Sequence, residues 1–578
     1  MIVRKKIGSL VAPPGFCQGR GVRRREAHVH VHEFTEKEGC AVNSAVRTRI
    51  RAALAACASG CVATGLIWGA APAQAVQPPR AAGLPASPAA VVAEPAPLLD
   101  AGSPDGQRFR ASGRLVGGGG TTCTATLVHA TGKPDPGAKA LVLSNGHCVD
   151  DAMGTNDVVV DKAAPADWSY TPAYFHDNVA EHRKFSVERV VYATMKDIDV
   201  SVLQLSATYG DLARLDVTPR TLATGRPAAG TALRAAHAPT DGVEDGRRFL
   251  RLSRCEATAS GVALHENTWL WKGSTRTDCL GISGGSSGGA VTTADDTGRL
   301  VGMLNTIATP GYPGCGPGRP CEGGAKGLIV PEDNAAYVTP VDDVASCLDA
   351  KGLRLRKKGC RLDRGEQAKV TGGGLHTQST TADGPARWNV HVTPGTTGNG
   401  THVAFKSGPF GAVDCTRPEG YAKPRRLTGA GVDHKEVLPK KDNLYVLCVA
   451  AGPDGTLKGA AWAASLAHPA YAYARVDNTA PTIAPTIDSR LFGEGEDASY
   501  RVSPVYAPWE ITGYKVKYGP RATTDCADTA GYRFYLGIPA SLKAVEGPWT
   551  YCAIGYDNAG NATPPAAFAL SPEGARDA

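Results

Sequence analysis

The sequence predicts an all-β protein with more than one domain. Between residues 113 and 350, short apolar runs alternate with turns rich in Gly, Asp and Pro, and no apolar pattern repeats at helical spacing. The chain contains 69 Gly and 41 Pro, whereas aromatic residues make up only 6%. Its 578 residues exceed what one hydrophobic core normally holds. We therefore expect a β-barrel or sandwich domain followed by further β modules.

The first 75 residues carry the pattern of an export signal. A basic flank at residues 47–51 precedes an apolar run at 52–71, and Ala73-Gln74-Ala75 supplies the small side chains that a signal peptidase accepts. Residues 1–41 resemble no part of such a signal, so residues 1–75 are interpreted as an upstream segment plus a secretory signal peptide. The apolar run is rich in Ala and Gly, which argues against a stable membrane anchor. We expect a secreted, extracellular protein.

The distribution of charge argues against nucleic acid as a partner. The net charge is +7, but residues 1–75 hold 11 Lys/Arg and 4 Asp/Glu and account for all of it. The remaining chain has 51 basic and 51 acidic side chains, so it has no basic surplus to attract phosphate groups.

The exported chain divides by composition. Residues 76–112 are rich in Pro and Ala without apolar periodicity, which predicts a linker or pro-segment. The next domain is expected at residues 113–350, with a closing helix at 341–348. Its expected strands lie at residues 124–128, 140–143, 157–160, 187–192, 200–205, 299–304 and 327–330.

An internal repeat follows residue 365. Each copy begins with a Gly-Pro pair and continues with Asp-Cys and then Gly-Tyr at the same spacing. The first copy has Asp414-Cys415 and Gly420-Tyr421, and the second has Asp525-Cys526 and Gly531-Tyr532. Each copy later carries a second cysteine in a run that contains Tyr. The pattern predicts two modules, residues 365–480 and 481–578, that resemble bacterial immunoglobulin-like or fibronectin-like β-sandwiches. A surface or a polymer is a candidate ligand of these repeats.

Twelve of the 16 cysteines follow residue 76, mostly in locally spaced pairs, as in disulfide-bonded proteins of an oxidising compartment. No array of Cys and His has metal-binding spacing, so we expect neither a metal nor another cofactor. Nearest-neighbour spacing and the repeat predict six disulfides: Cys123–Cys148, Cys255–Cys279, Cys315–Cys321, Cys347–Cys360, Cys415–Cys448 and Cys526–Cys552.

Three segments carry residue types suited to acyl transfer. His147 lies in Ser144-Asn145-Gly146-His147-Cys148, Asp199 opens an apolar run, and Ser287 lies in Gly285-Ser286-Ser287-Gly288-Gly289. In this order, the segments resemble the His, Asp and Ser segments of the chymotrypsin-like serine proteases. The resemblance covers residues 113–350. It implies a double β-barrel and a serine endopeptidase that acts on protein or peptide substrates.

The resemblance assigns a role to each residue. Ser287 would attack the peptide carbonyl, and His147 would remove its proton as a general base. Asp199 would hold the imidazole in the required tautomer. The backbone N–H groups of Gly285 and Ser287 would form the oxyanion hole. Cys123, 25 residues before Cys148, would fix the loop that carries His147.

Two of these assignments have competitors. Asp197 also resembles the family motif, but a longer alternating run follows Asp199, which we favour. Ser283 has the family's spacing from the preceding cysteine. We favour Ser287 because a strand at Ala290-Val291 follows it within a few residues, as expected after the nucleophile turn.

The family pattern also bears on specificity, activation and the role of the tail. Asp278 is a candidate acid at the floor of the specificity pocket, although an exposed loop position is at least as consistent with the spacing. Ser286 stands where trypsin-like zymogens have an Asp that pairs with a freed α-amine, so we expect activation without insertion of a new N-terminus. The repeats are expected to bind or space, so that a chain ending near Arg364 keeps its activity. Two alternative functions are an inactive protease-like binding protein and an adhesin.

Overall fold

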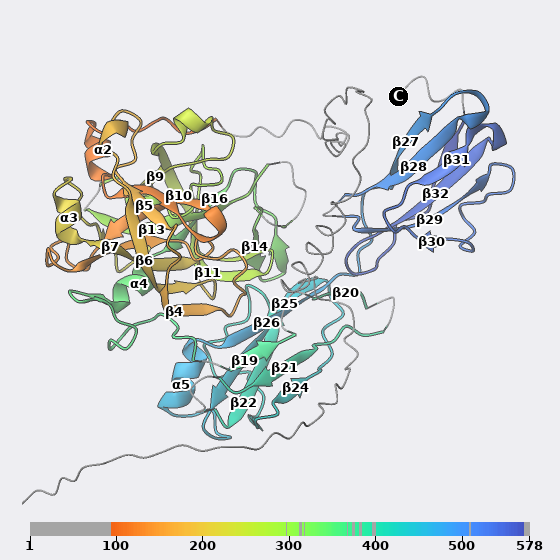
Figure 1. Ribbon diagram of the computed structural model, residues 1–578. Coiled ribbons are helices and arrows are strands. Elements are labelled where there is room, and N and C mark those ends of the chain that lie inside the picture. The colour runs from red at the N-terminus through yellow and green to blue at the C-terminus, as the bar shows by residue number, and fades with distance from the viewer. Residues whose placement is uncertain are drawn as a thin grey trace, which may run out of the picture. The chain divides into compact units, whose positions relative to one another are not determined.

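The computed structural model describes residues 94–571, apart from 296–297, 311–314, 317, 367, 373–375, 381–383, 396–399 and 508–509 (Figure 1). The predicted signal peptide and residues 76–93 of the predicted linker lie outside the described residues. Strands dominate the described chain, and its α-helices are short: α2 (Pro104–Arg108), α3 (Tyr209–Ala213), α4 (Asp342–Cys347) and α5 (Ala460–Ala467). None of the helices in these residues is long and apolar enough to cross a membrane. The all-β fold class is confirmed.

The first barrel is built from the strands before residue 210. These are β1 (Ser112–Val116), β2 (Thr122–Val128), β3 (Lys139–Ser144), β4 (Val158–Ala163), β5 (Ser169–Pro172), β6 (Phe185–Thr194) and β7 (Val200–Thr208). The order β6-β5-β1-β2-β3-β7 closes because β7 pairs back to β6, and all neighbours are antiparallel. Closure leaves no open edge within this ring, and β4 pairs with β6 outside it.

The second barrel closes in the same way. Its strands and their extensions are β8 (Thr221–Leu222), β9 (Ala232–His237), β10 (Arg251–Glu266), β11 (Trp269–Thr277), β12 (Ala290–Thr293), β13 (Arg299–Ile307), β14 (Cys321–Gly324), β15 (Gly327–Ile329) and β16 (Ala336–Pro340). The ring runs β11-β16-β13-β12-β9-β10, and β10 pairs back to β11. Strands β14 and β15 extend the sheet from β10.

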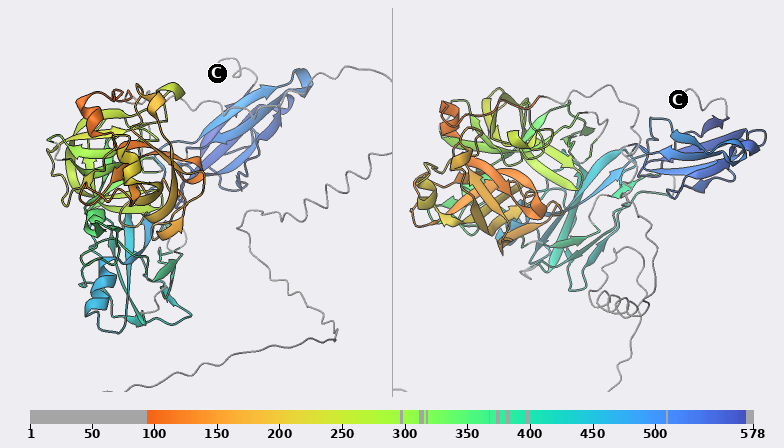
Figure 2. Two further views of the ribbon diagram at one scale, coloured as in Figure 1. Left: turned by 60° about the vertical axis from the view of Figure 1, so that its left-hand side comes forward. Right: turned by 45° about the horizontal axis from the view of Figure 1, so that its top comes forward.

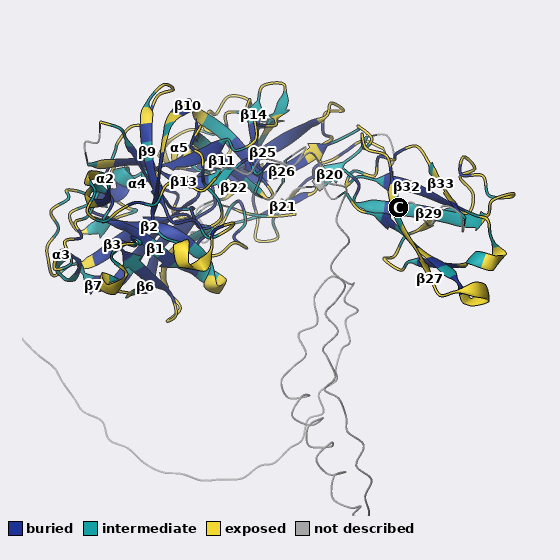
Figure 3. Cartoon of the chain, turned by 90° about the horizontal axis from the view of Figure 1, so that it is seen from above, coloured by how far each residue is buried: buried dark blue, intermediate teal, exposed yellow. Residues whose placement is uncertain are grey.

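The two barrels share their hydrophobic cores. One cluster joins Leu127 of the first barrel to Leu264 and Trp271 of the second. Another joins Val200 to Leu252. In Figure 3 the barrel strands are largely buried, and many of the exposed residues lie in turns and loops. The shared cores hold β2 and β3 of one barrel against β9 and β12 of the other, where the candidate site lies.

The segment before the first barrel runs beside β10. The N–H of Leu252 donates to the carbonyl of Pro97 at 3.0 Å, and the Arg251 guanidinium donates to the carbonyl of Ala96 at 2.6 Å. A side chain on Gly281 would meet the backbone nitrogen of Ala96 at 2.2 Å. The segment therefore lies directly against the loop that leads to Ser287.

Two β-sandwiches follow, after a small sheet of β17 (Leu348–Asp349) and β18 (Gly352–Leu353). Their strands are coloured green to blue in Figure 2. The first pairs β19-β21-β24 in one sheet and β20-β26-β25-β22-β23 in the other, and the second pairs β27-β28-β31 and β30-β29-β32-β33. Val392 and Leu447 contribute to the core of the first sandwich, and Val502 and Tyr551 to that of the second. The strand bounds are β19 (Lys369–Thr371), β20 (His376–Gln378), β21 (Val390–Thr393), β22 (His402–Pro409), β23 (Arg425–Arg426), β24 (Val432–His434), β25 (Asn443–Gly452), β26 (Ala470–Val476), β27 (Thr486–Phe492), β28 (Ser499–Val505), β29 (Gly513–Pro520), β30 (Arg533–Phe534), β31 (Ala540–Lys543), β32 (Trp549–Tyr556) and β33 (Ala566–Leu570).

The sequence repeat has a structural counterpart. In the first sandwich Lys406 of β22 lies opposite Cys448 of β25, and in the second Lys517 of β29 lies opposite Cys552 of β32. The described cysteines form six disulfides, in the pairs that spacing and the repeat predicted. Each sandwich thus has one disulfide, which fastens the loop after its Gly-Pro pair to a buried strand.

The first sandwich contacts both barrels through β26, and residues 94–571 belong to one compact unit. The backbone N–H and carbonyl of Tyr471 both bond to the side-chain amide of Asn156, at 2.8 and 2.7 Å. The Tyr471 hydroxyl donates to the Asp197 carboxylate at 2.7 Å and accepts from the Lys272 ammonium at 2.6 Å. Leu270 of β11 packs into the same buried cluster as Tyr471. The sandwich is therefore joined to the segment just before β7, which also carries Asp199.

Candidate active site

Asp199, just before β7, and His147, in the turn after β3, form a direct pair. One carboxylate oxygen of Asp199 accepts from the backbone N–H groups of Gly146 and His147, the latter at 3.1 Å. The other oxygen lies 2.6 Å from Nδ1 of His147, and the Asp199 side chain is fully buried, at 0% exposure. A carboxylate only accepts, so the neutral imidazole carries its proton on Nδ1 and presents an unprotonated Nε2.

The turn that carries His147 is fixed to β6 and β7. The Ser201 hydroxyl donates to the carbonyl of Asn145 at 2.8 Å, and the Asn145 side chain donates to the carbonyl of Asp199 at 3.0 Å. A side chain on Gly146 would meet the carbonyl oxygen of Thr194 at 2.2 Å. Only glycine fits between these strands, which explains the Asn-Gly-His order.

The surroundings of His147 favour its protonated form. Burial lowers the pKa of His147, but the charge and the hydrogen bond of Asp199, with smaller contributions from Glu266 and Asp151, raise the pKa above its usual value. The imidazole keeps 22% of its side-chain surface exposed and is open to a ligand. A partly open imidazole with a stabilised protonated form suits a general base.

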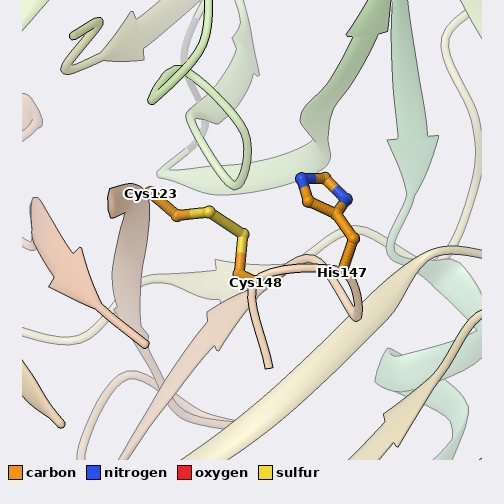
Figure 4. A group of neighbouring side chains, drawn as sticks. All are labelled: Cys123, His147 and Cys148. Atoms are coloured by element: carbon orange, nitrogen blue, oxygen red, sulfur yellow. A yellow bond between two sulfur atoms is a disulfide. The ribbon is translucent and has the colours of Figure 1, made fainter. Parts of the chain in front are cut away.

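A disulfide anchors the same turn to β2. Cys123 of β2 is bonded to Cys148, and Figure 4 shows the imidazole of His147 projecting from the turn beside this bridge. The two sulfurs and a ring nitrogen of His147 lie within 4.8 Å of one another. Both sulfurs are consumed by the disulfide and offer no thiolate, so this group is a structural anchor and not a metal site.

Ser287 lies in a glycine-rich turn that is also attached to β2. Its carbonyl accepts from the N–H of Thr124, at 2.7 Å, and Thr124 is the neighbour of Cys123. The Ser287 hydroxyl donates to the carbonyl of Asn305 at 3.3 Å, and among the described residues it has no hydrogen bond to His147. Hydrogen bonds between base and nucleophile are often long before substrate binds. The Ser287 turn and the His147 turn are thus both attached to strand β2, through Thr124 and Cys123.

Two backbone donors beside Ser287 are free. The N–H groups of Gly285 and Ser287 donate no hydrogen bond within the described part of the chain. Gly285 has φ of 92°, in the left-handed region, and its carbonyl accepts from the Thr124 hydroxyl at 3.0 Å. A side chain on Gly285 would also meet the nitrogen of Thr240 at 2.8 Å. This strained turn is accessible to glycine and leaves both N–H groups available to an anionic oxygen.

The competing residues have other partners. Asp197, with φ of 62°, lies 3.0 Å from Lys272 and bonds to Tyr471. Burial raises the pKa of Asp197, but the charges of Lys272 and Lys196 outweigh this effect and lower it. The Ser283 hydroxyl donates to the carbonyl of Asp241.

Asp278, the candidate for the pocket floor, is exposed. Its carboxylate accepts from the backbone N–H of Glu256 at 2.6 Å, which ties the end of β11 to β10. This contact accounts for Asp278 as a residue that stabilises the β10–β11 hairpin.

Two buried polar residues near the site were not found by sequence reasoning. Glu266, at the end of β10, accepts from the N–H of Gly318 at 2.7 Å, and burial raises its pKa. His237, at the end of β9, contacts Ser286. Neither lies in a motif, so no local sequence pattern singled them out.

Residues 101–303, which include His147, Asp199 and Ser287, match the family model described as a trypsin-like peptidase domain. Solved structures similar to this chain include the MamO protease domain from Magnetospirillum magneticum in its apo form, at 15% identity, covering 42% of this chain and 98% of that chain with a TM-score of 0.27. The protease Anisep from Arthrobacter nicotinovorans is 16% identical and covers 40% and 90%, with a TM-score of 0.27. The thermostable serine protease AL20 from an extremophilic microorganism is 17% identical and covers 40% and 92%, with a TM-score of 0.25. The comparison with curated proteins finds no match.

Proposed function

We propose that the chain is a secreted serine endopeptidase with His147, Asp199 and Ser287 as its catalytic residues. The observation that carries this proposal is the 2.6 Å contact between Asp199 and Nδ1 of His147, which leaves Nε2 free to accept a proton. The match of this region to a trypsin-like peptidase domain supports the same chemistry.

In the proposed reaction the Ser287 oxygen attacks the carbonyl carbon of the scissile peptide, and the hydroxyl proton passes to Nε2 of His147. The carbonyl oxygen becomes an oxyanion that accepts from the N–H groups of Gly285 and Ser287. Asp199 stabilises the imidazolium, which then gives its proton to the leaving amine. An acyl ester on Ser287 remains, and water hydrolyses it with His147 again as the base.

The test compares Ser287→Ala with Ser283→Ala on a generic protein substrate, with and without a serine-directed covalent inhibitor. Ser287→Ala should reduce hydrolysis to near background without unfolding the chain, because it removes one hydroxyl from a partly exposed turn. Ser283→Ala should keep most of the activity. Loss of activity in the second variant alone would show that Ser283 is the nucleophile. An unaltered chain that neither hydrolyses protein nor reacts with the inhibitor would indicate a protease-like binding protein or an adhesin.

Export is part of the proposal. The predicted signal peptide and the six disulfides support an extracellular location, because disulfides persist in oxidising compartments. We assign the peptidase to residues 113–350 and the two modules to 365–480 and 481–578. N-terminal sequencing of the protein in the culture medium should give a first residue at or after Val76, and a product retained in the cells with residues 1–75 intact would contradict export.

A further inference from the structure

A fully buried histidine lies directly behind the proposed nucleophile turn. His237 ends β9, has 0% exposure, and has no part in the reaction proposed above. Its Nδ1 is 2.8 Å from the hydroxyl oxygen of Ser286, and its Nε2 is 3.0 Å from the hydroxyl oxygen of Ser253 on β10. Ser286 and Ser253 are themselves buried, at 1% and 4% exposure.

The neighbouring donors and acceptors give these bonds a direction. The Ser253 hydroxyl donates to the carbonyl of Leu280 at 2.7 Å, so its oxygen accepts from His237. Nε2 of His237 must then carry the proton, and Nδ1 is the acceptor. The Ser286 hydroxyl therefore donates to Nδ1, and its oxygen accepts from the N–H of Ser283 at 3.3 Å. Every polar atom in this series has a partner of the right kind.

The histidine in this series is neutral. Burial, with the nearby charge of Arg251, lowers the pKa of His237 to about 3. A second proton on the ring would also point an N–H at the Ser286 hydroxyl, which already faces the ring as a donor. A buried imidazolium without a carboxylate partner is unfavourable.

Both ends of the series are attached to the same loop. Leu280 and Ser286 bound the segment that leads into the turn, and Gly285 and Ser287 flank Ser286 on either side. The middle of the loop is tied to the residues after β9, because Gly284 accepts from the N–H of Thr240 at 2.7 Å. The loop is thus held at its two ends by β9 and β10 through neutral side chains.

We propose that Ser286, His237 and Ser253 form a neutral hydrogen-bond relay that positions the N–H groups of Gly285 and Ser287 toward the oxyanion. The inference rests on the proposed peptidase function and adds three positioning residues to it. No proton is transferred through the relay. The side chains of His237 and Ser253 hold Ser286, the residue before the proposed nucleophile, through neutral hydrogen bonds and without an ion pair.

The kinetic test uses Ser253→Ala and Ser286→Ala in the full chain. Ser112→Ala is the matched control, because Ser112 is a buried serine of the first barrel that bonds to Thr126 at 3.0 Å. Each relay variant should lower kcat for a peptide ester about 10- to 100-fold with KM within about twofold, since a misplaced oxyanion donor affects the transition state more than bound substrate. The control should leave kcat unchanged, and the double variant should lose little more than the worse single variant.

A second measurement is independent of activity. In the full chain labelled with ¹⁵N-histidine, the His237 ring should give the signature of a neutral ring protonated at Nε2, unchanged between pH 4.5 and 8, and His237→Gln assigns the signal. If the relay variants keep the kcat of the unaltered chain, as the control should, the positioning role is overturned. The proposed peptidase function would still stand in that case, provided that the unaltered chain shows serine-dependent hydrolysis. A ring protonated at Nδ1, or one that titrates in this range, would overturn the relay itself. An unaltered chain without serine-dependent hydrolysis would refute the peptidase, and the ring signal would then decide the relay alone.

Discussion

Replacement of Asp199 by Asn tests the order of donors and acceptors around His147. Two backbone N–H groups, those of Gly146 and His147, point at one oxygen of the Asp199 side chain. An Asn side chain keeps its oxygen there, so its NH₂ group faces Nδ1 of His147. Nδ1 must then accept, and the ring proton moves to Nε2, which can no longer take the proton of Ser287.

The expected loss in Asp199→Asn is large and specific. An imidazole in the wrong tautomer costs about 10⁴-fold in kcat, or about 5.4 kcal/mol of activation free energy. The effect on folding should be smaller, about 1–3 kcal/mol, because the substitution keeps the shape of the side chain and weakens hydrogen bonds to a charged group. Peptide-ester hydrolysis and urea unfolding measure the two effects separately.

Asp197→Asn is the matched control, because this residue bonds to Tyr471 and Lys272 and not to His147. It should keep kcat within about tenfold of the unaltered chain, since no donor or acceptor of the imidazole changes. If Asp197→Asn loses activity about 10⁴-fold and Asp199→Asn does not, the assignment of the acid is wrong.

Three further predictions concern pH, the disulfide and the tail. Hydrolysis should fall as pH drops through the raised pKa of His147, and a flat rate profile through that pKa would argue against His147 as the base. The same raised pKa should stabilise the fold below about pH 6.5, and this contribution should be lost as pH rises through the folded-state pKa. Replacement of both Cys123 and Cys148 by Ala should lower the free energy of unfolding by about 3.5 kcal/mol, because their separation of 25 residues sets the closed loop, and unchanged urea unfolding would contradict this. A chain ending near Arg364 should lose stability and activity, because it exposes Leu270 and removes Tyr471 from Asp197, whereas a chain ending after Thr482 should keep both. Thermal unfolding and ester hydrolysis of the two chains test this, and equal behaviour would refute a stabilising role of the Tyr471–Asp197 contact.

The truncation prediction differs from the one that the sequence alone suggested. The sequence assigned the repeats to binding or spacing, because the three proposed catalytic residues lie upstream of them. The hydroxyl of Tyr471 reaches Asp197 across 274 residues of chain. A contact of this range leaves no local pattern, so only the folded chain reveals it.

Much of the first barrel could be predicted because its strands are continuous apolar runs. The run at 200–205 corresponds to β7, which continues to Thr208, and the predicted closing helix corresponds to α4. Strand β10 was missed, although it is 16 residues long. Its register shifts between Ala257 and Ala259 and again before Val262, and Gly261 has φ of 77°, so its side chains do not alternate regularly between the two faces.

The site shows the same division. His147, Asp199 and Ser287 stand in short motifs whose chemistry can be read locally. His237 is 49 residues from Ser286, and Glu266 ends the strand that was missed. Residues that support a turn through a hydrogen bond from a distant strand carry no motif of their own, because only the folded structure decides which turn they contact.

The segment beside β10 sets a limit on N-terminal maturation. A protease that trimmed the chain past Pro97 would remove the acceptors of Leu252 and of the buried Arg251 guanidinium, and would uncover the loop at Gly281. Trimming that stops before Ala96 leaves all of these contacts in place. The Pro- and Ala-rich stretch upstream is therefore the part of the chain that can be shortened, and the mature protein should begin within it.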